Sequence, residues 1–108
     1  MRNPDSTTVS PEVLREIARL TALKVPGVHA ASPRRHGIGA GADEGVRVQI
    51  EDGLVDVDLY LVMDAAVNLR QVSREVQAAV ARAISEMLGM IAGRINIHID
   101  DVYFPTAG

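Results

Sequence analysis

The chain has 108 residues, of which 47% are hydrophobic, and this suffices for the core of one domain but leaves no room for a second. It contains no cysteine, which excludes disulfide bonds, thiolate metal sites and cysteine nucleophiles and favours the reducing environment of the cytoplasm. A net charge of -3 and the scarcity of aromatic residues argue against nucleic acid as a partner, and no segment approaches the roughly 20 apolar residues of a membrane-spanning helix.

The first predicted element is a helix that begins after Ser10. Residues 1–9 are mostly polar and predict a disordered N-terminal tail. Ser10 is a favourable N-cap residue, and Pro11 suits the first helical position. Pro26 disfavours helical geometry in the residue before it, so we expect the helix to end near residue 23 or 24. The apolar residues at helical spacing are Val13, Leu14, Ile17, Ala18 and Leu20.

Residues 29–45 predict a flexible Gly/Ala-rich loop and no regular element. The run HAASPRRHGIGAGADE has no hydrophobic period, and its composition offers little apolar surface to offset the entropy of ordering it. Its glycines follow a helix, whereas a phosphate-binding loop follows a strand. Arg34, Arg35 and His36 suit an anion, although a solvated charge cluster is the simpler interpretation.

Residues 46–63 predict a β-hairpin whose turn is Asp52-Gly53, a favoured two-residue turn sequence. Apolar and polar residues alternate on both sides of the turn. Pairing Val48 with Val57 places three apolar pairs on one face, whereas a slip of one residue would bury the aspartates of the second strand. We therefore expect this register.

A second, longer helix is predicted between Asn68, a suitable N-cap, and Gly89. A third strand follows Gly93, where isoleucines at 95, 97 and 99 alternate with polar residues. The helix buries an apolar stripe, which makes it a principal wall of the core. The stripe consists of Leu69, Val72, Val76, Val80, Ala83, Ile84 and Met87.

These elements predict an α+β fold, a two-layer sandwich of αββαβ order with two helices packed on one face of a three-stranded sheet. The connection through the long helix is expected to be a right-handed crossover. Residues 10–104 form the domain, and residues 105–108 form a C-terminal tail. The pattern does not decide whether the third strand pairs with the first or with the second.

The sheet face without helices is the candidate interaction face. One interpretation is a recognition surface, including one for a second copy of the chain, and the other is an ordinary solvated sheet face. Tyr60 among charged residues suits the role of an anchor, and an exposed strand edge is a second place where association is expected. Strand alternation assigns to this face Arg47, Gln49, Asp56, Asp58, Tyr60, Asn96, His98 and Asp100.

Two alternative functions remain open beside protein interaction. His98 with Asp100, Asp56 or Asp58 has the side-chain types of a divalent-metal site, although alternating polar residues produce this spacing by default. The αββα part is similar to a KH domain, but the G-x-x-G loop on which RNA binding depends is absent. No serine lies in a G-x-S-x-G motif, so no catalytic residue is predicted.

Four segments resemble the alkaline-shock-protein family of bacterial envelope stress response proteins, also called Gls general stress proteins. They are SPEVLREIARLTALKVPGV, GVRVQIEDGLVDVDLYLVM, VNLRQVSREVQAAVARAISEMLGM and INIHIDDVYF. The specific matches are Pro26-Gly27-Val28, Asp58-Leu59-Tyr60, Val67-Asn68, Asn96-Ile97-His98-Ile99 and Asp101-Val102.

The resemblance implies a cytoplasmic protein of Gram-positive-type bacteria that has no enzymatic activity and no cofactor. It also implies self-association and a position at the inner side of the membrane, reached through a separate membrane-anchored partner protein and without insertion of the chain itself. The family has no defined catalytic motif, so no site residue follows from the resemblance. The Gly-rich stretch from Arg34 to Gly45 differs from the family pattern.

Overall fold

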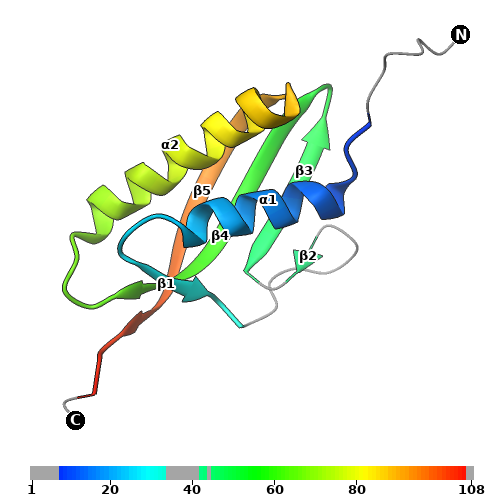
Figure 1. Cartoon of the computed structure of the whole chain (residues 1–108). Helices are drawn as coiled ribbons and strands as arrows, with labels where there is room; N and C mark the ends of the chain where they lie inside the picture. Colours follow the sequence, from blue (N-terminus) through cyan, green and yellow to red (C-terminus); the bar gives the residue numbers. More distant parts are fainter. Residues whose placement is uncertain (1–7, 34–41, 44, 107–108) are drawn as a thin grey trace, which may run out of the picture.

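In a computed structural model, which describes residues 8–33, 42–43 and 45–106, two helices lie on one face of a five-stranded sheet (Figure 1). This confirms the α+β class and the placement of both helices on one face. The elements in chain order are α1 (Pro11–Leu23), β1 (Val28–Ala31), β2 (Ala42–Asp43), β3 (Val46–Glu51), β4 (Leu54–Asp64), α2 (Leu69–Leu88) and β5 (Ile91–Tyr103).

The sheet has two more strands than the sequence predicted, because β1 and β2 lie within the stretch expected to be a loop. The expectation of no regular element in residues 29–45 is therefore wrong at 29–31 and 42–43. Strand β4 has 11 residues, and β3 pairs with its first part, so the rest of the same edge accepts β1, with Ala31 opposite Leu61. Such long-range pairing leaves no local pattern. The remainder of the expected flexible loop, 34–41 and 44, lies outside the described residues, as do 1–7 and 107–108 of the tails.

The hairpin of β3 and β4 has the predicted register. Val48 lies opposite Val57, and the paired residues Glu51 and Leu54 flank the turn. Asp52 and Gly53 have φ angles of 50° and 77°, as expected for a two-residue turn in which both residues are left-handed.

Strand β5 pairs with β4 in parallel, which answers the question that the sequence left open. Tyr60 lies beside His98 in this pairing, and β5 begins at Ile91, ahead of the predicted start after Gly93. Strand β4 therefore lies at the centre, with β5 along one edge and β3 and β1 sharing the other.

Both helices begin at their predicted caps. The Ser10 side chain accepts a hydrogen bond from the Val13 N–H, and the Asn68 side chain accepts one from the Gln71 N–H. Helix α2 ends at the left-handed Gly89. The predicted tail is wrong at Val9, which packs against the core.

The core lies between the helices and the inner sheet face. Alternation along β4 directs its odd-numbered side chains inward, and all five of them are fully buried, which is worth about 1.5–3 kcal/mol for each large apolar side chain. The predicted α2 stripe is wrong at Met87, which is 67% exposed because the stripe continues from Ile84 to Leu88, four residues on, and Leu88 packs against the core in its place. The central buried residues are Val55, Val57, Leu59, Leu61 and Met63 from β4, Val72, Val76, Val80 and Ile84 from α2, and Leu14, Ala18 and Ala22 from α1.

Candidate interaction face

The sheet face opposite the helices carries the eight polar residues named above, and we call it the open face. The register places Arg47 opposite Asp58 across β3 and β4, and Asp58 beside Asn96 across β4 and β5. All eight residues are partly or fully exposed. The face is therefore continuous over three strands and accessible to another molecule.

Four side chains at its centre hold one another in place, and we call them the Asp58 cluster: Asp58, Tyr60, Asn96 and His98. Asp58 Oδ1 accepts a hydrogen bond from Asn96 Nδ2 at 3.2 Å and lies 3.0 Å from His98 Nε2. A carboxylate oxygen accepts, so this contact is a hydrogen bond in the His98 tautomer that carries its hydrogen on Nε2. The rings of Tyr60 and His98 stack with centroids 4.5 Å apart and an interplanar angle of 13°. The cluster orients two aromatic rings on the open face.

Hydrogen bonds also hold the two aspartates on either side of the cluster. Asp56 Oδ1 accepts from the backbone N–H of Arg94 at 2.7 Å, and Asp100 Oδ2 accepts from the Ser32 hydroxyl at 2.6 Å. Ser32 is 1% exposed, and its N–H donates to the Tyr60 carbonyl at 2.8 Å. Sequence reasoning assigned Ser32 to a loose loop, since nothing local indicates that β1 delivers it to β4.

A second aromatic stack was missed by the sequence analysis. His29 of β1 stacks on Tyr103 of β5 with centroids 3.8 Å apart and an interplanar angle of 5°. The His29 Nδ1 also lies 3.5 Å from Asp64 Oδ1. The three residues come together because β1 and β5 both pair with the last part of β4. No local sequence pattern predicts these two strand pairings, so the stack could not be found from the sequence.

The described residues contain no group of three or more histidine, aspartate or glutamate side chains placed to hold a metal ion. His98 contacts Asp58, but Asp100 bonds to Ser32 instead of converging with them. The hypothetical anion site of Arg34, Arg35 and His36 lies outside the described residues. In the same described ranges, neither helix is long and apolar enough to cross a membrane.

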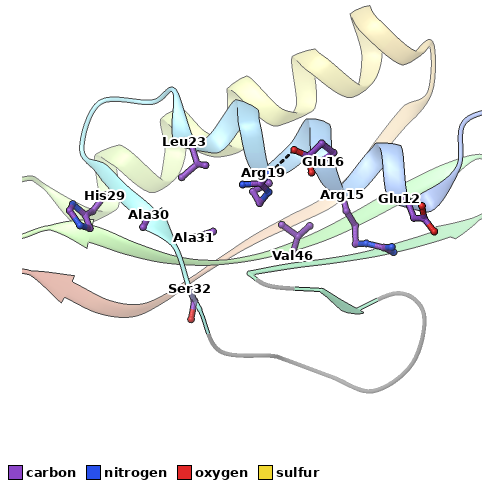
Figure 2. A pocket seen from close by; sticks show the side chains of 10 residues that line it. All are labelled: Glu12, Arg15, Glu16, Arg19, Leu23, His29, Ala30, Ala31, Ser32 and Val46. Atoms are coloured by element: carbon purple, nitrogen blue, oxygen red, sulfur yellow. Dashed lines mark hydrogen bonds and ion pairs between the residues drawn. The ribbon is translucent and has the colours of Figure 1, made fainter.

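A pocket of about 880 Å³ lies between α1 and strands β1 and β3 (Figure 2). Its α1 wall carries two arginines and two glutamates, and Arg19 forms an ion pair with Glu16. Charges of both signs on one wall give no preference for an anion or a cation. The lining residues are Glu12, Arg15, Glu16, Arg19, Leu23, His29, Ala30, Ala31, Ser32 and Val46.

Fold and face together define a small α+β domain with one helix-covered and one open, polar sheet face. The chain belongs to the alkaline shock protein 23 family, described as having a cell envelope-related function, whose profile matches residues 2–104. This confirms the resemblance found in the sequence.

Two relatives support this membership. The uncharacterized protein Spy1535 of Streptococcus pyogenes serotype M6 is 30% identical over 98 residues, covering 87% of this chain and 76% of its own. The uncharacterized protein YqhY of Bacillus subtilis is 29% identical over 107 residues, covering 91% of this chain and 77% of its own.

Solved structures of MamM CTD share the fold. A variant of MamM CTD superposes with a TM-score of 0.61 at 18% identity, covering 85% of this chain and 98% of its own. Its copper form gives a TM-score of 0.56 at 15% identity, covering 90% and 91%. Identities this low establish similarity of fold alone.

Proposed function

We propose that the protein is a non-enzymatic component of the envelope stress response that works as a self-associating protein-interaction module. A membrane-anchored partner protein recruits it to the cytoplasmic side of the membrane. The envelope-related description of the family supports the location. The open face supports the interaction role.

The observation that carries the proposal is the ordered Asp58 cluster on an exposed surface. Its hydrogen bonds and ring stack orient Tyr60 and His98 before any partner arrives, which lowers the entropy cost of binding. Aromatic side chains are frequent anchors of protein interfaces, whereas surrounding charges select orientation more than they add affinity. The cluster thus combines an aromatic anchor with charges that fix its orientation.

A double substitution tests the role of the cluster. We expect Tyr60→Ser with His98→Ser to weaken self-association by at least about 1 kcal/mol, measured by sedimentation over a concentration series. The matched control is Gln71→Ser with Glu75→Ser, which removes an exposed hydrogen-bonded pair from α2 and should leave association unchanged. Association of the cluster variant at the parent level would show that the open face is ordinary solvated surface.

Membrane recruitment requires a separate test. The protein should co-sediment with native membrane vesicles of a bacterium that carries it, and treating the vesicles with protease beforehand should abolish the binding. Liposomes made from extracted lipids serve as the control, because they contain no partner protein. Equal binding to liposomes would contradict recruitment by a partner protein and would indicate direct binding to lipid.

A further inference from the structure

Strand β5 forms a margin of the sheet and is the longest strand of the described chain. It has 13 residues and pairs with β4 on one side, and no strand among the described residues lies on its other side (Figure 1). A free edge presents backbone N–H and C=O groups that another strand can pair with. The hydrogen bonds that β5 and β4 already make show which backbone groups of this edge remain available for pairing.

The hydrogen bonds of Tyr60 determine which β5 residues face outward. The Tyr60 N–H donates to the Gly45 carbonyl and the Tyr60 carbonyl accepts from the Ser32 N–H, so both groups point away from β5. Leu59 and Leu61 therefore point toward β5. In a parallel ladder each of them bonds to the residues on either side of its register partner, Ile97 or Ile99. The backbone groups of these two isoleucines consequently face outward.

Both ends of the outward edge are blunted. The Gln77 side chain of α2 donates to the Ile95 carbonyl at 2.8 Å, and the Val102 N–H donates to the Asp101 side chain at 2.8 Å. The register also shifts between Ile99 and Asp101, where β5 carries an extra residue. Bulges and side-chain caps of this kind limit edge pairing. The open stretch is therefore centred on His98, with Ile97 and Ile99 on either side.

We propose that this stretch pairs antiparallel with the same stretch of a second copy, about a two-fold axis at His98. The inference rests on the self-association proposed above. Ile97 of one copy lies opposite Ile99 of the other. The two-fold axis creates two such pairs, and in each pair the outward backbone N–H and C=O groups of both isoleucines form hydrogen bonds. An axis at Ile97 would require the capped Ile95, and an axis at Ile99 would require the bulge at Asp101. The outward backbone N–H and C=O groups of two copies therefore match each other in this register.

Exposed apolar residues are concentrated in β5 and in the residues that adjoin it in the sequence. Nine large hydrophobic residues are exposed in the described chain, and five of them lie in β5 or within four residues of its ends. They are Met87, Ile91, Ile99, Tyr103 and Phe104. A second copy of the chain would contribute the same exposed apolar residues from its own side of the contact. An extended peptide of another protein would pair only with the short open stretch. This favours a second copy as the occupant.

Cross-linking tests the register, because the chain has no cysteine of its own. In the proposed pairing the two copies of residue 98 form a non-hydrogen-bonded pair with Cα atoms about 4.5 Å apart, within the range of a disulfide bond. We expect His98→Cys to give a disulfide-linked dimer under mild oxidation. Asn96→Cys is the matched control, since it is exposed on the same strand face but would be displaced about 13 Å along the strand from its copy and should form no disulfide-linked dimer.

A charge at the edge provides a second test that leaves the cluster intact. Ile99→Lys, at a position 38% exposed, should weaken self-association about tenfold, because lysine on an edge strand opposes pairing. Leu20→Lys, at a position 44% exposed on α1, should leave association unchanged.

The possible results separate this inference from the proposed function. A monomeric parent protein at all concentrations would overturn both. A self-associating parent whose Ile99→Lys variant associates equally well, or whose residue 98 cross-links no faster than residue 96, would overturn the edge pairing alone. Preferential cross-linking between a mixed pair of the 96 and 98 variants would also overturn it, because that result requires the axis at Ile97.

Discussion

Gly45 lies where β1, β3 and β4 meet, and its lack of a side chain permits that junction. Its φ is +70°, its carbonyl accepts from the Tyr60 N–H, and an added Cβ would lie 2.9 Å from the Ala31 Cβ and 3.1 Å from the Ser32 nitrogen. Gly45→Ala is therefore expected to lower the free energy of unfolding by about 2–4 kcal/mol, measured in urea, since backbone strain and the close contacts add. Gly53→Ala is the control, because its φ of +77° is similar but nothing lies within 4 Å. Equal losses at both glycines would show that backbone strain alone matters at the junction.

Among the elements, β4 contributes most to the core, because it is flanked by strands on both edges and covered by helices on one face. Leu59 is 0% exposed, whereas Ile50 on β3 is 40% exposed. Leu59→Ala should cost about 2–5 kcal/mol of unfolding free energy from lost burial and the cavity left behind, and Ile50→Ala should cost less than about 1.5 kcal/mol. Urea denaturation of both variants checks this order. A smaller loss for Leu59→Ala than for Ile50→Ala would contradict a core centred on β4.

At the scale of the whole molecule, association and stability are linked. A second copy that binds only the folded chain stabilises the fold by mass action, so the melting temperature of the parent protein should rise with its concentration. The Ile99→Lys variant should show the same rise only at about tenfold higher concentrations, since its self-association is about tenfold weaker. Calorimetry at several concentrations measures both. A concentration-independent melting temperature for the parent across the range where sedimentation detects oligomers would contradict the linkage.

Local features of the sequence were sufficient to predict both helix starts, the hairpin register and which residues occupy the open face. Ser10 and Asn68 cap their helices through bonds three residues away, and the Asp52-Gly53 turn sets the pairing of its neighbours, so each signal acts over a short separation. The tertiary structure alone decided that β1 and β5 both lie against β4. It therefore also decided the bond between Ser32 and Asp100, 68 positions apart, and the stack of His29 on Tyr103. The physical reason is that every residue except proline offers the same backbone hydrogen-bonding groups, so the residue types do not specify which strands pair. A distant strand pairs where a free strand edge lies next to an apolar face that its side chains can help to bury.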